Sequence, residues 1–96
     1  MTPYPDVSRS LAAYDRSGTL IPGWTQLISR RADQFANGVS PLYAQRAKGA
    51  RFIDIDENEF IDWVSAVGAI ILGHADDVVD AAVIEQIGRG SIYTLN

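Results

Sequence analysis

His74, the single histidine of the sequence, is the first candidate for a metal ligand. Asp76 and Asp77 follow it closely, and an imidazole with carboxylates can bind a transition metal. The alternative is structural, because carboxylates at the start of a helix are stabilised by the positive end of its dipole. We favour the structural interpretation, since a metal site or a catalytic triad needs further partners.

The densest acidic stretch comprises Asp54, Asp56, Glu57, Glu59 and Asp62. Paired carboxylates can act as acid and base, or they can bind calcium. Calcium loops have a central glycine, and no glycine lies between residues 54 and 62. On alternating strand positions these side chains are predicted to form a solvated face.

Covalent chemistry depends on Lys48, because the sequence has one lysine and no cysteine. A desolvated lysine can form a Schiff base with a carbonyl group. Lys48 follows Arg46 in a predicted hairpin turn, where it should be hydrated and charged. The residues alone therefore indicate an α+β domain without a catalytic constellation.

Composition narrows the possible partners. The 96 residues make one small domain with a formal charge of −4 and no clustered basic face, which argues against nucleic acid. The longest apolar run, residues 67–72, is far shorter than the roughly 20 residues that span a bilayer. We expect a soluble, cytoplasmic chain without membrane partners.

The first segment, residues 1–41, is predicted to contain one helix and an irregular stretch. Asp6 or Ser8 can cap a helix that runs through about Ser17 and ends at Gly18. Residues 21–23 form a turn, and residues 24–39 have no clear period.

The middle segment, residues 42–64, is predicted to be a three-stranded antiparallel meander. Strands are expected at 42–47, 51–55 and 60–64, because apolar and polar residues alternate and the connections are short. The last segment, residues 65–96, is a connector and a helix. Residues 69–72 are expected to be a buried strand or packed loop, and the helix runs from Asp76 to Arg89 with one apolar face. The apolar tail after Gly90 suggests a chain that continues.

Several short strings then occur together in one order. They are LIPG at 20–23, TQ at 25–26, SRR at 29–31, RAKG at 46–49, FIDIDENEFIDW at 52–63, LGH at 72–74 and AV at 82–83. In order and spacing they resemble the N-terminal part of class III pyridoxal-phosphate aminotransferases, above all enzymes of the glutamate-1-semialdehyde aminomutase type. The resemblance covers about residues 20–96.

This resemblance implies a fold-type I enzyme, an aminotransferase or an aminomutase (an isomerase), that works as a homodimer with pyridoxal 5′-phosphate. In the family the Schiff-base lysine, the phosphate-binding loop and the aspartate at the pyridine nitrogen all lie further along the chain. We therefore expect residues 1–96 alone to bind no cofactor and to be inactive.

Two substrate-binding positions follow from the resemblance. Arg30 falls where aminomutases hold the substrate carboxylate, with Arg31 one position away. Val67 falls where they have a tryptophan over the substrate, so the substrate here can differ. Trp24, Glu57 and Asp77 also depart from the family pattern, at two glycines and a proline respectively.

The preferred hypothesis is thus an N-terminal segment of an enzyme that moves amino groups on small carboxylate substrates. The alternative is a stand-alone interaction or oligomerisation module without catalytic activity.

Overall fold

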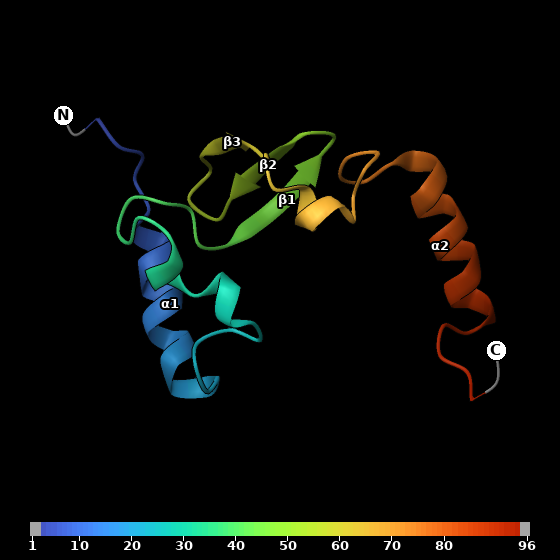
Figure 1. Ribbon diagram of the computed structural model, residues 1–96, viewed down its shortest axis with the longest axis horizontal. Coiled ribbons are helices and arrows are strands. Elements are labelled where there is room, and N and C mark those ends of the chain that lie inside the picture. Colours follow the sequence, from blue (N-terminus) through green and yellow to red (C-terminus); the bar gives the residue numbers. More distant parts are fainter. Residues whose placement is uncertain (1–2, 95–96) are drawn as a thin grey trace.

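The computed structural model describes residues 3–94 and has the α+β architecture predicted from the sequence (Figure 1). An N-terminal helix precedes a three-stranded sheet, and a second helix follows it. The elements are α1 (Ser8–Leu20), β1 (Ala44–Lys48), β2 (Arg51–Asp54), β3 (Glu59–Ile61) and α2 (Asp77–Arg89), with 3-10 turns η1 (Ile28–Arg30), η2 (Ala32–Gln34) and η3 (Ser65–Gly68).

Helix α1 is capped mainly by a residue that is distant in the sequence. The carboxylate of Asp56 accepts hydrogen bonds from the backbone N–H of Arg9 at 2.6 Å and of Ser10 at 2.9 Å. The hydroxyl of Ser10 donates to the same carboxylate at 2.6 Å. Of the two residues predicted as caps, Asp6 accepts from the N–H of Ser8 at 3.0 Å, and Ser8 caps nothing. The first-turn amides are therefore satisfied largely from the β2–β3 turn.

The sheet has the order β1-β2-β3, and both pairs are antiparallel, as the meander predicts. Phe52 on β2 lies opposite Phe60 on β3, and their rings stack with centroids 5.3 Å apart. Such cross-strand aromatic pairs stabilise a sheet through side-chain packing. The third strand ends at Ile61 rather than at the predicted residue 64, because the chain turns at Asp62.

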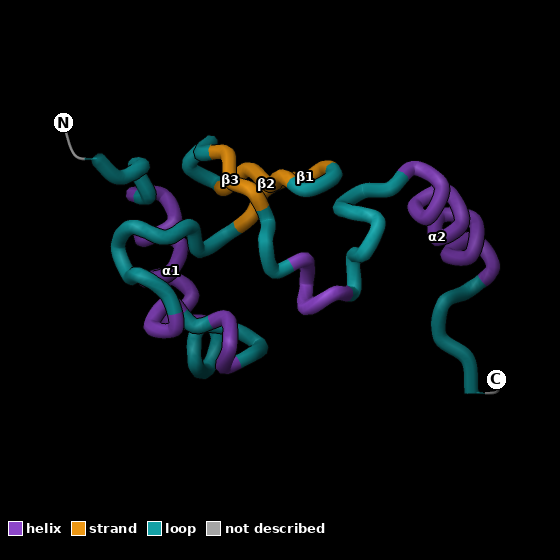
Figure 2. Tube along the Cα trace, turned by 45° about the horizontal axis from the view of Figure 1, so that its top comes forward, coloured by secondary structure: helices purple, strands orange, loops and turns teal. Residues whose placement is uncertain are grey.

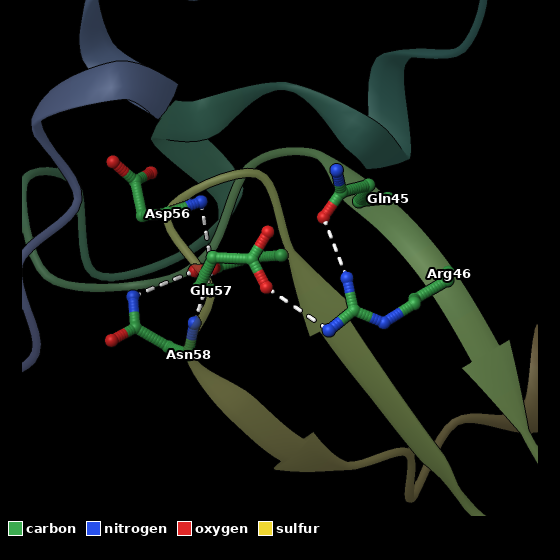
Figure 3. A network of polar contacts seen from close by, with 6 residues as sticks. Gln45, Arg46, Asp56, Glu57 and Asn58 are labelled. Atoms are coloured by element: carbon green, nitrogen blue, oxygen red, sulfur yellow. Dashed lines mark hydrogen bonds and ion pairs between the residues drawn. The ribbon is translucent and has the colours of Figure 1, made fainter.

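The predicted solvated acidic face is wrong for Asp54, which is fully buried. Its carboxylate accepts from the backbone N–H of Asp56 at 3.0 Å and of Asn58 at 2.8 Å, and from the Asn58 side chain at 3.0 Å. Glu57, in the same turn, points outward and pairs with Arg46 at 3.0 Å (Figure 3). The alternation of residue types did not reveal that the turn needs a buried acceptor.

The molecule is extended rather than compact. α1 and α2 lie at opposite ends of the sheet in both views (Figures 1 and 2). The radius of gyration is 16.2 Å, whereas a compact domain of this length has about 12.5 Å. Between residues 3 and 94 the buried apolar side chains are Val7 and Ala32 alone, and α2 buries none of its residues.

Candidate functional site

A hollow of about 310 Å³ lies beside α1. Its wall comes from α1, from the turn that follows, from η1 and from the residues that lead into β1. The side chains that define its character are Tyr14, Ser17, Trp24, Arg30, Leu42 and Tyr43. The hollow thus combines aromatic and apolar walls with one guanidinium group.

Trp24 is held against α1 in a backbone conformation that is uncommon for a bulky residue. Its φ is 65°, and its indole stacks on the ring of Tyr14 with centroids 5.8 Å apart. Gly18 faces the indole so closely that a Cβ at this position would collide with it. Gly18 was predicted to end α1, but the helix continues to Leu20. Position 18 needs a residue without a side chain, because Trp24 approaches the helix there.

The two neighbouring arginines, Arg30 and Arg31, lie in different places. Arg30 lines the hollow. Arg31 packs against the turn at Gly23, where a Cβ would lie 2.8 Å from its Nη2 atom. Tyr43, which also lines the hollow, is held by α1, because its hydroxyl lies 3.0 Å from Ser17 Oγ. Ser17 already donates its one proton to the carbonyl of Ala13, so Tyr43 is the donor of this bond.

Val67 is not part of this hollow. It lies on η3, between the sheet and α2, and its side chain is 92% exposed. The structure therefore does not bring Arg30 and Val67 into one pocket. The following residues are also exposed, with Ile71 at 88% and Leu72 at 67%, which contradicts the buried strand or packed loop predicted for residues 69–72.

The η3 turn is a left-handed segment of backbone. Ser65, Ala66 and Val67 have φ values of 48°, 50° and 58°, and Gly68 follows at 87°. For residues other than glycine this region costs on the order of 1–2 kcal/mol each, and a β-branched valine is especially rare there. Nothing in the residue types predicts this conformation, because only Gly68 favours it.

Asp62 precedes the turn and contacts His74 behind it. Its Oδ1 atom accepts from the backbone N–H of Val64 at 3.0 Å and of Ser65 at 2.9 Å. Its Oδ2 atom lies 2.7 Å from Nε2 of His74. The hydrogen bond from Ser65, followed by that from His74, lowers the pKa of Asp62 below its ordinary value.

The geometry around His74 favours the structural interpretation over a metal site. Its imidazole is engaged by Asp62, while Asp76 caps α2 by accepting from the N–H of Val78 and Val79 at 3.1 and 3.0 Å. Among the described residues, no cluster of three or more histidine and carboxylate side chains is suited to a metal ion.

Lys48 is occupied by a salt bridge. Its Nζ atom lies 2.5 Å from Oδ1 of Asp77 and donates to the carbonyl of Ala75 at 2.6 Å. The hydrogen bond to Asp77 raises the pKa of the lysine. The side chain is 64% exposed, so its environment is hydrated as predicted and it is charged. A nucleophilic amine would need the opposite environment.

Curated proteins similar to this chain have related names. Glutamate-1-semialdehyde 2,1-aminomutase 2 of Exiguobacterium sibiricum is 44% identical over 86 residues, which are 90% of this chain and 19% of that protein. 3-Aminobutyryl-CoA aminotransferase of Cloacimonas acidaminovorans is 38% identical over 90 residues, 93% of this chain and 22% of that protein. The chain thus spans about a fifth of the length of these relatives. No protein-family model matches it.

The fold of this chain is similar to parts of solved transaminase and aminomutase structures. An omega-transaminase from Sphaerobacter thermophilus superposes with a TM-score of 0.76 at 28% identity, covering 95% of this chain and 21% of that one. A glutamate-1-semialdehyde aminomutase from Pseudomonas aeruginosa PAO1 gives 0.78 at 31% identity, covering 92% and 19%. Within residues 3–94, no helix has the length and apolar character to cross a membrane.

Proposed function

Because the chain is a class III aminotransferase-like N-terminal segment in sequence and in fold, we propose that it serves an enzyme that moves amino groups on small carboxylate substrates. The enzyme uses pyridoxal phosphate and is a transaminase or an aminomutase. The observation that supports this role is the position of Arg30 in an aromatic-walled hollow. A guanidinium group there can bind a carboxylate through two parallel hydrogen bonds.

The residues of this chain do not fit covalent attachment of the cofactor. The one lysine, Lys48, is charged, exposed and bound to Asp77 and Ala75. The lysine that holds pyridoxal phosphate therefore has to come from the remaining part of the enzyme. The contribution of this chain is to bind and orient the substrate, not to carry the reacting group.

Val67 completes the proposed substrate contacts from a second position. Its small side chain stands on η3 and is open to solvent. A valine offers less stacking area than an aromatic side chain, so the part of the substrate that meets it differs from that of an aminomutase substrate. Arg30 would bind the carboxylate. Val67 lies outside the hollow of Arg30, so it would meet the other end of the substrate only where the rest of the enzyme brings the two positions to one site.

The proposal includes a homodimer in the cytoplasm, without nucleic acid. The absence of cysteine from the sequence suits a reducing compartment. The formal charge of −4 is unfavourable for binding to the phosphate backbone of nucleic acid. The exposed apolar residues of α2, such as Val78 at 80% and Ile84 at 70%, require a protein surface to cover them.

A chimera tests the proposal. This chain replaces the 86 aligned residues of the Exiguobacterium sibiricum aminomutase, and amino transfer is measured over a panel of small amino-carboxylates. We expect a chimera that binds pyridoxal phosphate and transfers amino groups from at least one of them. A folded, cofactor-loaded chimera that is inactive on the whole panel would contradict the proposal.

The role of Arg30 is tested in the same chimera. Arg30→Ala should raise KM for a carboxylate substrate, because a lost charged hydrogen bond costs about 1.5–3 kcal/mol, roughly tenfold to hundredfold in KM. Arg16→Ala, at an exposed position of α1, is the matched control and should leave KM unchanged. An unchanged KM in the Arg30 variant, with a raised KM in Arg31→Ala, would move the role to Arg31.

The exposed face of α2 also favours the alternative of a stand-alone interaction module. Such a module would bind a partner through α2 and would need neither Arg30 nor a cofactor. The chimera separates the two, because an interaction module has no reason to support amino transfer.

A further inference from the structure

The left-handed η3 turn needs a cause outside its own sequence. Ser65, Ala66 and Val67 all have positive φ values, and strain of this kind persists only where the surroundings fix the backbone. Packing among residues 3–94 does not fix it, because Ala66 and Val67 are exposed there. The bonds inside the turn, such as that from the N–H of Val67 to the carbonyl of Val64 at 2.9 Å, are ones that a right-handed turn can also form.

The carboxylate of Asp62 supplies a constraint at the start of the turn. One oxygen accepts from two successive N–H groups, those of Val64 and Ser65, and thereby sets the direction in which the backbone enters. The main chain of Asp62 is itself fixed, because its N–H donates to the carbonyl of Ala50 at 2.9 Å. The acceptor is therefore attached to the sheet and not free to follow the turn.

His74 supplies the constraint at the other end, 12 residues later. Its backbone N–H and carbonyl both pair with Gly49 in the β1–β2 turn, at 2.8 and 2.9 Å. Gly73 lies so close that a Cβ there would be 2.9 Å from the Cα of Gly49. The imidazole of His74 then reaches back to Asp62 at 2.7 Å, with Nε2 facing the carboxylate as the donor.

We propose that Asp62 and His74 form a clamp that closes the loop between them and holds η3 left-handed. The two residues are thereby the positioning residues for Val67. The clamp joins both ends of the loop to the β1–β2 hairpin, so the position of Val67 is set by the sheet. The consequence for substrate choice rests on the proposed function, whereas the clamp itself does not.

The clamp is tested by NMR spectroscopy on the 96-residue chain, using the scalar couplings that separate positive from negative φ at residues 65–67 together with amide hydrogen exchange of Val67. We expect positive φ in the unchanged chain. Asp62→Ala should abolish that signature and speed exchange at Val67 by about tenfold or more, since the turn then opens locally. Asp80→Asn, a carboxylate on α2 that does not contact the turn, is the matched control and should change neither.

The same Asp62→Ala substitution, made in a Val67→Gly variant, shows whether the clamp offsets backbone strain at residue 67. In Val67→Gly the left-handed conformation carries no penalty at residue 67. The acceleration of exchange caused by Asp62→Ala should therefore be at least about threefold smaller in this background than in the unchanged one. Equal acceleration in the two backgrounds, or negative φ at residues 65–67 in the unchanged chain, would overturn the proposal.

Asp62→Ala could also unfold the sheet, which would be seen as lost protection from amide exchange at Phe52 and Phe60. In that case two milder variants test the clamp. His74→Gln leaves both backbone bonds of Asp62 in place, and Asp62→Asn keeps one acceptor oxygen. Faster exchange at Val67 with an intact sheet in either variant supports the clamp, and an unchanged Val67 in both overturns it.

In the chimera, His74→Gln should alter the ratio of kcat/KM between a short and a long amino-carboxylate substrate, because Val67 moves. An unchanged ratio in an active chimera would remove the link to substrate choice. An inactive, cofactor-loaded chimera would instead count against the proposed function, and the NMR result on the chain would still stand.

Discussion

Asp54, Asp56 and Asp62 each accept backbone hydrogen bonds in a turn or at a helix end. Their residue types and their alternation along the chain are the same as those of a solvated strand face. They differ from such a face in accepting hydrogen bonds from backbone N–H groups. The folded chain places these N–H groups beside them, and the residue types alone do not show which groups these are. Lys48 differs, because its position beside a tight turn was sufficient to predict a hydrated and charged amine.

Asp56 should make the stability of the chain depend on pH. Burial would raise the pKa of Asp56, but the hydrogen bonds from the Ser10 hydroxyl and from the backbone of Arg9 and Ser10 outweigh it, and the pKa lies below the ordinary 3.8. A lowered pKa stabilises the fold above the unfolded value, and this contribution is lost as the pH falls through the folded value.

The measurement is the free energy of unfolding between about pH 6 and about pH 2. Asp56→Asn should lower stability near pH 6 by about 1 kcal/mol, because the amide keeps only one of the two acceptor oxygens, and it should flatten the acid limb. Asp15→Asn, at an exposed position of α1, should have less than about 0.5 kcal/mol of effect. A parallel acid limb in the Asp56 variant would show that this carboxylate is not the titrating group.

Lys48 should not form a Schiff base with pyridoxal phosphate. Its amine is protonated, donates to Asp77 and Ala75, and has a raised pKa, so little of it is nucleophilic. Mixing the chain with the cofactor, reducing with borohydride and digesting should yield no labelled peptide in stoichiometric amount. Stoichiometric label on Lys48 would refute this.

At the scale of elements, the helices and the hairpin followed from hydrophobic period and turn residues, and the structure confirms their order. Helix α2 was predicted from Asp76 to Arg89 and is found from Asp77 with Asp76 as its cap. The η3 turn could not be predicted, because its conformation depends on Asp62 and His74 rather than on its own residues. Arg30 was predicted as a substrate-binding residue from the family resemblance alone, and the hollow that it lines has no signature in the residue types.

Two helical glycines should respond in opposite ways to the same substitution. Alanine favours a helix over glycine by about 1 kcal/mol. A Cβ added to Gly88 in α2 would meet no neighbouring atom of the described residues within 4 Å, so Gly88→Ala should stabilise the chain by about 0.5–1 kcal/mol. Gly18→Ala should destabilise it, because the new methyl group displaces the indole of Trp24 from Tyr14.

Thermal unfolding and tryptophan fluorescence measure both effects. The emission of Trp24 should shift toward that of a solvated indole in Gly18→Ala and stay unchanged in Gly88→Ala. A stabilised Gly18→Ala variant with unchanged emission would mean that Trp24 does not pack on α1 in solution.

At the scale of the whole molecule, the apolar surface is distributed over parts that do not cover each other. Val67, Ile71 and Val78 are each at least 80% exposed, and they belong to η3, the following loop and α2. The chain is extended, with a radius of gyration of 16.2 Å, and the described residues leave most of the surface of these side chains open to solvent. Exposed apolar area of this extent marks an interface or a tendency to aggregate.

The isolated chain should therefore self-associate. Analytical ultracentrifugation over a range of concentrations should show mass above that of a monomer, and the thermal midpoint should depend on concentration. Val83→Lys combined with Ile87→Lys, which lie one turn apart on the apolar face of α2 and are 50% and 61% exposed, should shift the distribution toward monomer. A monomer with a sharp, concentration-independent transition would favour the stand-alone module.

The cap of α1 also has a consequence for the order of events during synthesis. α1 ends at Leu20, and Asp56 lies 36 residues further on (56 − 20), so a ribosome adding about 5–20 residues per second completes α1 roughly 2–7 s before its cap exists. A 13-residue helix without its cap is marginal in water. α1 therefore has to wait for the β2–β3 turn, and a pause in translation between the two would prolong the time during which its first turn is frayed.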